Sequence, residues 1–363
     1  MKILGLAADE GGCGFYRMRS PALAAQALGV EIEISDGLDA TALQHPDGTV
    51  EVNEINTDAD LIIFQRPLDN AMTSAIKQAK RQGIATIVEI DDDFSSVSKA
   101  NIAYEWMYGK SHTGAAWVEK ATAEADHVTV STPQLAKYAR HGRYSVLRNC
   151  VPDSIFSVDK DPLAPDSAEI RIGWSGTVQT HPYDLQETKG QVAKVLLDND
   201  LKFSVVGDGS MVATHLGLPK GHRVLETGWV SLEDYYAYLK TFIDIGIVPL
   251  ELSQFNQAKS ALKGLEFAAL GIPFVASPTR EYERLEAYGI GKVARTPAEW
   301  RKHLQRMIDR PSETEALSRE YRDRIEAEHT YSVNAPQWIE AWEKAIDYRR
   351  THRYEQTGTD RRD

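Results

Sequence analysis

The sequence predicts an α/β protein made of two doubly wound domains, on the basis of three observations. Short apolar runs rich in valine and isoleucine alternate with helical patterns along almost the whole chain, which is typical of βα units around parallel sheets. The length of 363 residues exceeds what a single core usually organises. The alternation stops at a polar stretch, residues 158–167, and starts again at residue 170. We therefore expect an N-terminal domain over residues 1–155 and a C-terminal domain over residues 168–330.

The first domain opens on an apolar run, residues 2–6, that leads into a glycine-rich loop. We interpret this run as a buried strand rather than a signal peptide, whose apolar core would be longer. A short helix should begin near Thr132 and Pro133, because a hydroxyl residue followed by proline favours a helix start. The other expected strands are 30–34, 60–64, 84–90, 127–130 and 145–147, and the expected helices are 21–28, 69–82 and 101–123.

The second domain repeats the alternation and ends in a series of helices. Trp338, Trp342 and Ile346 are spaced four residues apart in the last helix, so they form one apolar stripe that needs a surface to cover. The expected strands are 170–175, 203–206, 223–226, 244–248, 273–276 and 292–294. The expected helices are 184–197, 232–241, 259–270, 297–308, 313–328 and 335–350.

Composition limits the function classes. Lys and Arg number 41 against 53 Asp and Glu, and the net charge of −12 disfavours nonspecific nucleic-acid binding by the whole surface. No stretch approaches the roughly 18 apolar residues that a membrane span needs. The only cysteines, Cys13 and Cys150, exclude a disulfide framework and fit a reducing cytoplasm. The sequence also lacks zinc-ligand spacing, a Gly-x-Ser-x-Gly elbow and a Walker loop, which removes the common hydrolase and ATPase alternatives.

Residues 244–277 carry the strongest candidate site, a strand, loop, helix, glycine stop and second strand. Within the expected helix, Lys259, Lys263 and Glu266 would share one face. The amides at the helix N-terminus and the two lysines would favour a diphosphate, and Glu266 could accept hydrogen bonds from a ribose diol. A solvated face of weakly paired lysine and glutamate side chains is the alternative on spacing alone.

This segment resembles the donor-binding signature of GT-B glycosyltransferases, particularly the retaining family that includes sucrose- and glycan-building enzymes. Glu266 and the residues after it match the second glutamate of the Glu-x7-Glu motif and its helix–strand continuation. The chain departs from the family at Ala258, where the first glutamate would stand. The lysine pattern, with Ser260 directly after Lys259, is similar to a divergent branch often encoded by bacteriophages, in which Lys259 and Lys263 would face the diphosphate.

The resemblance implies a GT-B fold, in which two Rossmann-like domains face a cleft and the C-terminal domain binds the donor. It implies that the helix over residues 331–350 crosses back to the N-terminal domain, and residues 351–363 are expected to form a disordered tail. It also implies that a nucleotide-diphosphate sugar, with a UDP-sugar favoured, serves as co-substrate and that the reaction uses no metal or other cofactor.

A second block, residues 171–185, predicts a strand, a glycine turn and a helix, a geometry in which backbone amides can meet a phosphate. Ser175, Gly176 and Thr177 are the donor-binding candidates of this turn. His181 could donate a hydrogen bond to the diphosphate or to the leaving oxygen, and an exposed loop histidine is the alternative. The divergent branch has a similar run of Gly, Ser or Thr, His and Asp-Leu at this place.

A third block follows the next two strands of the C-terminal domain. Gly207 and Asp208 come after the strand at 203–206, and glycine there permits close approach of a ligand to the backbone. A plain turn is the alternative. The loop with Trp229 and Val230 resembles the place where the family holds the edge of the nucleobase.

The N-terminal domain should present the acceptor. Gly14, Phe15 and Arg17 lie in the glycine-rich loop after the first strand, which lacks the GxGxxG spacing of a dinucleotide fingerprint. In GT-B enzymes the equivalent loop lies beside the transferred sugar. Arg66, at the end of the third strand, and His112, in a second glycine-rich stretch, are further acceptor-binding candidates.

Asp91, Asp92 and Asp93 follow the fourth strand and contain a formal Asp-x-Asp, the metal motif of the GT-A fold. The doubly wound pattern around them and the donor signature elsewhere argue against that interpretation. We expect Asp91 and Asp92 to act in catalysis beside His181 and Lys259, one carboxylate serving as a base, and Asp93 to bind acceptor hydroxyls. A run of helix-capping acids is the alternative.

Together the residues and the resemblance predict a metal-independent enzyme in the cytoplasm (of the host, if phage-encoded) that transfers a hexose or similar sugar to a hydroxyl acceptor with retention. Three acceptors compete: a hydroxylated base in phage DNA, a phage or cell-surface protein, and a lipid or small glycan. The acidic net charge disfavours DNA. No integral membrane contact is expected. A nucleotide-sugar epimerase and a non-catalytic sugar-binding module, which share the fold, are the alternatives from other classes.

Overall fold

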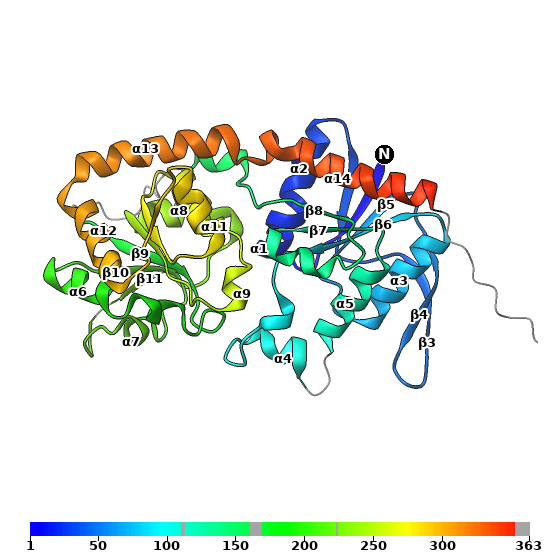
Figure 1. Cartoon of the computed structure of the whole chain (residues 1–363), viewed down its shortest axis with the longest axis horizontal. Coiled ribbons are helices and arrows are strands. Elements are labelled where there is room, and N and C mark those ends of the chain that lie inside the picture. The colour runs from blue at the N-terminus through cyan, green and yellow to red at the C-terminus, as the bar shows by residue number, and fades with distance from the viewer. Residues whose placement is uncertain (110–112, 160–168, 223, 353–363) are drawn as a thin grey trace, which may run out of the picture. The chain divides into compact units, whose positions relative to one another are not determined.

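The computed structural model describes residues 1–109, 113–159, 169–222 and 224–352 (Figure 1). Contacts divide the chain into two units. The first unit contains Met1–Asp91, Trp106–Arg148 and the chain from Ala335 on, and the second contains Asp92–Glu105 and Asn149–Asn334. Each unit is an α/β body with one parallel sheet, in agreement with the predicted class. Among the described residues, no helix is both long and apolar enough to cross a membrane.

The first unit is built on a six-stranded sheet in the order β2-β1-β5-β6-β7-β8, and every pairing is parallel. β5 and β6 are buried at every position, as expected for strands covered on both faces. The strand order reverses at β1, so the carboxyl ends of β1 and β5 form the switch point of this sheet. The strands are β1 Lys2–Leu6, β2 Glu31–Ser35, β5 Leu61–Gln65, β6 Ala85–Ile90, β7 His127–Val130 and β8 Tyr144–Val146.

One predicted helix start of the first half carries a side-chain cap, that of α3, whereas Thr132 before η3 makes no such hydrogen bond. The Asp69 carboxylate accepts from the Met72 amide at the start of α3. The predicted helix over 101–123 is divided into α4 and α5, and the one predicted near Pro133 is a 3-10 helix. The helical segments are α1 Gly12–Gly14, a π-helical turn η1 Phe15–Arg19, α2 Ser20–Ala27, α3 Asn70–Arg81, η2 Phe94–Ser96, α4 Ala103–Tyr108, α5 Gly114–Glu124, η3 Pro133–Tyr138 and η4 Asp153–Ser157.

One element of the first unit was not expected, an antiparallel hairpin of β3 Ala40–Gln44 and β4 Val50–Ile55. The hairpin packs against α3 (Figure 1). Four of the five residues of β3 are exposed, so the strand lacks the alternation of apolar and polar residues that reveals a half-buried strand.

The last helix, α14 Tyr331–Thr351, groups with the first unit from Ala335 on. Trp338, Trp342 and Ile346 of the predicted apolar stripe are all buried. Near the end of this helix, the Arg349 guanidinium donates to Asp126, which precedes β7, at 2.8 Å. The predicted tail, 351–363, lies outside the described residues beyond His352.

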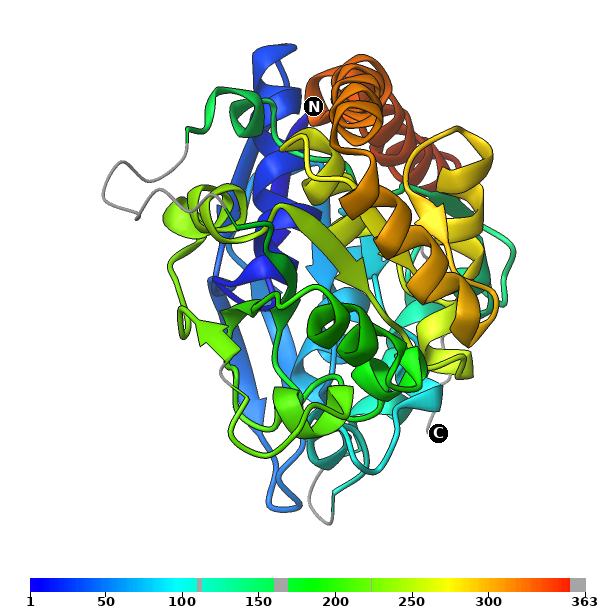
Figure 2. The ribbon, with the colours of Figure 1, turned by 90° about the vertical axis from the view of Figure 1, so that its left-hand side faces the viewer.

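The second unit has a six-stranded parallel sheet in the order β11-β10-β9-β12-β13-β14. Numbered within the unit, this is the order 3-2-1-4-5-6 of dinucleotide-binding folds, with its switch point between β9 and β12. Its helices are coloured green to orange in Figure 2. The strands are β9 Ile172–Gly176, β10 Phe203–Gly207, β11 Val224–Glu226, β12 Ile245–Val248, β13 Phe274–Ala276 and β14 Lys292–Val293. The helices are η5 Asp184–Thr188, α6 Gln191–Asp198, α7 Val212–Leu216, α8 Leu232–Phe242, α9 Gln254–Gln257, α10 Leu262–Ala269, α11 Arg280–Ala287, α12 Pro297–Asp309 and α13 Pro311–Glu328.

Helices cover both faces of the second sheet. On one face Trp174 of β9 and Phe203 of β10 belong to a core cluster with side chains of α6, α7 and α12. On the other face glycines let apolar side chains approach the strands. A Cβ on Gly246 would lie 2.6 Å from the ring of Phe267, so this glycine allows α10 to pack tightly on β12. The close packing of α10 positions the candidate donor residues.

The structure corrects two expectations about this unit. The predicted helix over 259–270 begins later, at Leu262, so Lys259 precedes α10 rather than sharing a helical face with Lys263. The segment Asp92–Glu105 groups with the second unit, although it lies within the sequence of the predicted N-terminal domain. Most of the predicted linker, 158–167, lies outside the described residues.

Candidate functional site

The carboxyl edge of the second sheet brings a lysine against a glycine turn. Gly176 ends β9 with φ 141°, a conformation that side-chain-bearing residues rarely adopt. A Cβ there would lie 3.1 Å from Nζ of Lys263, on α10, so the ammonium group lies against the backbone of the turn. Lys263 Nζ also lies 5.3 Å from the centre of the Trp174 ring. The turn and the first helical turn of α10 therefore form one cationic corner at the switch point.

Burial changes the protonation of this corner. It lowers the pKa of Lys263 to about 8, with Asp184 and Glu266 opposing the shift and Lys259 adding to it. Lys263 is therefore charged at neutral pH, yet close enough to its pKa to respond to a bound anion. A diphosphate would stabilise the ammonium form and raise that pKa.

His181 and Asp184 form a dyad beside Lys263. His181 Nδ1 lies 2.6 Å from Asp184 Oδ2, and Asp184 Oδ1 accepts from the Glu251 amide and from Asn256 Nδ2, both at 2.8 Å. Burial, to which the Lys263 charge adds, lowers the pKa of His181 to about 4 against the opposing effect of Asp184. Burial would raise the pKa of Asp184, but the hydrogen bond from His181 brings it below its ordinary value.

The protonation of the dyad determines what His181 can do. Because Asp184 is ionised and only accepts, Nδ1 of the neutral imidazole carries the proton and Nε2 carries the lone pair. The predicted hydrogen bond from His181 to a diphosphate needs a proton on Nε2, which this tautomer lacks. The neutral ring can instead accept a hydrogen bond from a hydroxyl group.

Glu266 lies in α10, one turn beyond Lys263, and is 3% exposed. Its Oε2 accepts from Tyr235 Oη at 3.3 Å, and the same phenol lies 2.7 Å from Ser175 Oγ. Ser175 is also 3% exposed. Its hydroxyl is thus committed to Tyr235, whereas the prediction had it bind the donor.

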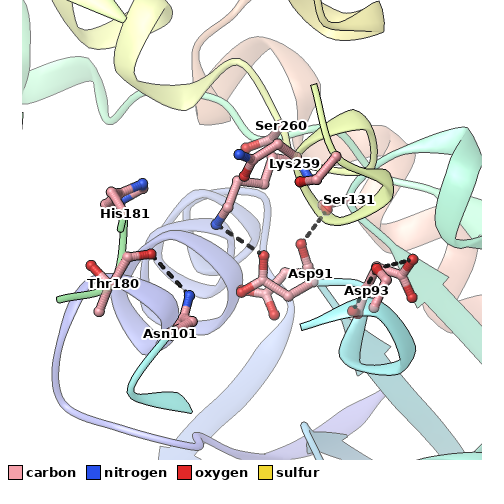
Figure 3. A network of polar contacts seen from close by, with 12 residues as sticks. Asp91, Asp93, Asn101, Ser131, Thr180, His181, Lys259 and Ser260 are labelled. Carbon is pink, nitrogen blue, oxygen red and sulfur yellow. Dashed lines mark hydrogen bonds and ion pairs between the residues drawn. The ribbon is translucent and has the colours of Figure 1, made fainter. Parts of the chain in front are cut away.

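Lys259 lies in the loop between α9 and α10. Its ammonium group is 3.3 Å from Asp92 Oδ1, with both side chains about one quarter exposed. Nζ also lies 4.6 Å from the centre of the Phe255 ring. Figure 3 draws Lys259 together with His181 and Thr180 in one close-up of the polar contacts. In this state Asp92, a predicted catalytic residue, neutralises the lysine proposed to meet the diphosphate.

The segment from Asp92 to Glu105 adds further contacts to this edge. Asn101 Nδ2 donates to the Thr180 carbonyl at 2.9 Å (Figure 3), and the Ile102 amide donates to the Gln179 carbonyl at 3.2 Å. Thr180 lies in the loop between Thr177 and His181. The segment therefore fixes the loop that carries the His181 dyad.

The remaining donor candidates lie around the same strand ends. Thr177 is buried, and its Oγ1 receives the Gln179 amide in a local turn. Ser260 Oγ accepts from Asn149 Nδ2 at 2.8 Å. Ala258, which stands in place of the family's first glutamate, is 2% exposed.

Gly207 ends β10 directly against the backbone of the Gly176 turn, which occupies the space where close approach of a ligand was predicted. A Cβ on Gly207 would lie 2.4 Å from the Gly176 carbonyl oxygen, so glycine is required for the two turns to lie together. Asp208 is partly exposed, and hydrogen bonds from Ser210 lower the pKa of its carboxylate. Trp229 is 76% exposed, a large apolar surface beside the strand ends, and its neighbour Val230 is half-buried.

In the first unit, the predicted acceptor loop follows β1. Gly14 is buried, and a Cβ there would lie 1.9 Å from the Asp9 carbonyl oxygen. Gln65, at the end of β5, anchors the loop because its side chain accepts from the Ala8 amide and donates to the Cys13 carbonyl. Phe15 begins the π-helical turn η1 and remains partly exposed.

Arg66 and Asp91 form a two-point ion pair at the end of β5 and β6. Arg66 Nε is 2.5 Å from Asp91 Oδ1 and Nη2 is 2.7 Å from Oδ2. Arg66 has φ 49°, a strained backbone for a residue other than glycine. The Asp91 main-chain carbonyl accepts from Ser131 Oγ (Figure 3). Both carboxylate oxygens of Asp91 are thus held by Arg66. To serve as the predicted base, Asp91 would have to leave this ion pair.

Two acceptor candidates have structural positions instead. Arg17 is 1% exposed, and its guanidinium donates to Glu89 Oε1 at 2.7 Å and to the Leu147 carbonyl at 2.6 Å, so it has no surface for an acceptor. Asp93 is also 1% exposed and accepts from Ser95 and Ser96, both at 2.7 Å. Asp93 directly precedes η2, but its carboxylate accepts from serine hydroxyls and makes no side-chain cap to the helix backbone, so the capping alternative does not describe it either. Another predicted acceptor residue, His112, lies outside the described residues.

Four polar residues of the site were missed or unassigned in the sequence: Asp184, Tyr235, Asn256 and Asn101. Asp184 was visible only as part of the run after His181. The other three lie in helices or short turns whose sequence gives no sign of their direction. Among the described residues, no group of three or more His, Cys, Asp or Glu side chains could hold a metal ion.

Comparison with known proteins agrees with this geometry. Residues 191–340 match the family model of glycosyl transferase-like proteins. Sucrose-phosphate synthase from Thermosynechococcus elongatus matches with a TM-score of 0.63 and 14% identity, over 96% of this chain and 100% of that one. HepE of Anabaena, in complex with UDP and glucose, matches with a TM-score of 0.62 and 13% identity, over 94% and 99%. The O-GlcNAc transferase of Thermobaculum terrenum gives 0.55 and 15%, over 96% and 68%. No curated protein sequence matches the chain.

The likeness over the full length confirms the predicted GT-B class with two Rossmann-like domains. The family match lies within the second half of the chain and contains α8, β12 and α10, the elements that carry Tyr235, Lys263 and Glu266. It confirms the predicted enzyme class, a glycosyltransferase.

Proposed function

We propose that the chain transfers a sugar from a nucleotide-diphosphate donor to a hydroxyl group, and that the donor binds at the carboxyl edge of the second sheet. One observation carries the proposal. Lys263 lies against the Gly176 turn at the switch point between β9 and β12, and Glu266 follows it in the same helix. A phosphate-binding cation and a sugar-binding carboxylate are thus about one helical turn apart, at the place where this fold takes nucleotides.

The diphosphate would lie between the Gly176 turn and the start of α10. Lys263 would meet its charge directly, and Lys259 would leave Asp92 to add a second cation. The two ammonium groups supply the charge that stabilises a departing diphosphate, so we propose a reaction without a metal. Chelator-treated enzyme should retain full turnover in a metal-free buffer.

The nucleoside would lie beyond the diphosphate. Glu266 would accept hydrogen bonds from the pentose diol, and the exposed face of Trp229 lies in the loop proposed for the base. We favour a uridine nucleotide because HepE, similar in fold, was captured with UDP.

The neutral imidazole of His181 would accept a hydrogen bond from a hydroxyl of the transferred sugar through Nε2. We propose transfer with retention, on the resemblance of residues 259–277 to the retaining family. In such a reaction the donor phosphate assists the incoming hydroxyl on the same face of the sugar. The anomeric configuration of the product, determined by NMR, tests this point. For the acceptor we propose the same three classes as above: a DNA base, a protein or a glycan. We also propose that the enzyme works in the cytoplasm.

The deciding experiment measures nucleoside diphosphate release and binding with a panel of UDP-, GDP- and ADP-sugars. We expect one nucleotide family to bind and to be hydrolysed slowly without acceptor. Isomerisation of the donor without release would indicate an epimerase, and binding without any turnover would indicate a sugar-binding module.

A double variant ties the activity to the proposed site. Lys259→Gln with Glu266→Gln should weaken nucleotide binding by at least about 30-fold, because a charge contact and a charged hydrogen bond are both lost. Lys302→Gln, on the exposed side of α12, is the matched control. Unchanged affinity in the double variant would refute the proposed donor site.

A further inference from the structure

Tyr235 connects two buried residues of the donor edge that are far apart in sequence. Its phenol oxygen lies 2.7 Å from Ser175 Oγ at the end of β9 and 3.3 Å from Glu266 Oε2 in α10. Ser175 and Glu266 are each 3% exposed. The strand and the helix that carry the proposed phosphate and pentose contacts are therefore joined by one hydroxyl group from α8.

The donor in each of these two hydrogen bonds follows from the chemistry of the three side chains. The Tyr235 phenol donates to the Glu266 carboxylate, which only accepts. Tyr235 has a single proton, so Ser175 must donate to the phenol oxygen. Burial and the Glu266 charge raise the pKa of Tyr235 well above its ordinary value, so the phenol keeps its proton at any working pH. In this series of hydrogen bonds, Ser175 donates to Tyr235 and Tyr235 donates to the Glu266 carboxylate.

A carboxylate held in this way has fewer orientations than one free to rotate at the end of a glutamate side chain. A glutamate side chain loses rotamer entropy when a ligand fixes it, and the hydrogen bond from Tyr235 supplies that order before any ligand arrives. A pentose diol then meets a carboxylate that already points in one direction. The benefit depends on ligand hydroxyls, because only they use the orientation.

We propose that Tyr235 is a positioning residue that makes this donor site selective for ribonucleotides over deoxyribonucleotides by orienting Glu266. The inference rests on the proposed donor site and adds to it a residue that determines pentose specificity.

The test compares UDP with 2′-deoxy-UDP and 3′-deoxy-UDP by calorimetry, in the full-length protein. Wild type should bind UDP more tightly than the deoxy forms. In Tyr235→Phe, which removes only the hydroxyl, affinity for UDP should fall about tenfold, as for loss of a hydrogen bond to a charged group. One of the two deoxy nucleotides should bind wild type more weakly than the other. The affinity of Tyr235→Phe for that nucleotide should differ from the wild-type value by less than about threefold. The ratio of the affinity for UDP to the affinity for this deoxy nucleotide should therefore be smaller in the variant than in wild type.

Two further variants separate positioning from a general loss of structure. Tyr238→Phe, one turn further along α8, removes a hydroxyl from a ring that stacks on Phe242 and should leave both affinities unchanged. Ser175→Ala removes the hydroxyl group that donates to Tyr235. It should also reduce the preference for UDP over the deoxy forms, but by a smaller factor than Tyr235→Phe does.

The outcomes distinguish the two proposals. If wild type binds no nucleoside diphosphate, the proposed function and this inference both fail. If wild type discriminates and Tyr235→Phe discriminates equally well, the donor site stands and the role of Tyr235 is refuted. An equal loss for UDP and deoxy-UDP also refutes it, because a merely structural role would weaken all ligands alike.

Discussion

The 2.6 Å contact between His181 Nδ1 and Asp184 Oδ2 fixes the imidazole as the tautomer with its lone pair on Nε2. Asp184 is itself fixed, because its second oxygen accepts from the Glu251 amide and from Asn256. A loop histidine, which alone would rotate in solvent, is thus held in one orientation at the switch-point edge.

Asp184→Asn should reduce turnover about 10- to 100-fold while changing nucleotide affinity less than about threefold. An amide can present either an oxygen or an NH2 group to Nδ1, so the ring is no longer restricted to one tautomer. Loss of the carboxylate that orients a functional histidine typically lowers activity by about 10- to 100-fold. Steady-state kinetics with the donor found by the nucleotide panel, together with calorimetry of the product nucleotide, give the two values.

A double-mutant cycle controls this prediction. Because Asp184 acts through His181, the variant Asp184→Asn with His181→Ala should be no slower than His181→Ala alone. Additive losses would mean that Asp184 contributes by another route, and the dyad would lose its proposed meaning.

Nucleotide affinity should fall as the pH rises above about 8. Lys263 has a pKa lowered to about 8, so its ammonium form is populated below this pH and is lost above it. A diphosphate binds the charged form, and affinity should therefore decrease by up to tenfold per pH unit on the alkaline side. Calorimetry of UDP between pH 6.5 and 9.5 measures the inflection.

Two lysine variants assign that inflection. Lys263→Met should bind weakly and without the alkaline inflection. Lys259→Met should move the inflection to higher pH, because the Lys259 charge contributes to the lowered pKa of Lys263. An inflection that persists in Lys263→Met would show that another group titrates.

Asp92→Asn should increase nucleotide affinity by about threefold. Asp92 lies 3.3 Å from Lys259 Nζ and neutralises it in the free protein, so a diphosphate must compete with this carboxylate. Partly exposed pairs contribute about 0.2–1 kcal/mol, which limits the gain. Glu233→Gln, an exposed carboxylate at the start of α8, is the control for a general change in charge. Weaker binding in Asp92→Asn would mean that Asp92 orders the site rather than competes with the ligand.

The fold was predictable where burial leaves a mark on the sequence. β5 and β6 are buried at every position and appear as apolar runs, and the Trp338 and Trp342 stripe of α14 appears as a helical period. The β3–β4 hairpin has neither signal, because β3 is mostly exposed. The start of α10 was placed three residues early, since propensity does not show that the chain turns between Ala258 and Ala261 before entering the helix.

The candidate site was predictable in position and less so in side-chain direction. Residues that follow parallel strands meet at one edge, which is why the Gly176 turn was selected, and Lys263 was selected from the spacing of its helix and the family resemblance. Whether such a side chain points outward depends on its partners. Asp93 turns inward to two serines, and Arg17 turns inward to Glu89. Tyr235 was missed because its partners lie 60 and 31 residues away.

Arg17→Met should lower the free energy of unfolding by about 3 kcal/mol and leave nucleotide affinity within about twofold. Arg17 and Glu89 are each 1% exposed, and the guanidinium lies 4.7 Å from the centre of the Trp338 ring, so its loss leaves a buried carboxylate without its cation. Replacing both partners by methionine should recover most of the loss, because the pair's desolvation cost disappears with it. Urea unfolding followed by tryptophan fluorescence measures both variants. If Arg17→Met lowers the free energy of unfolding by less than about 1 kcal/mol, or if it weakens UDP binding while the protein keeps its full stability, Arg17 contacts a ligand as first predicted.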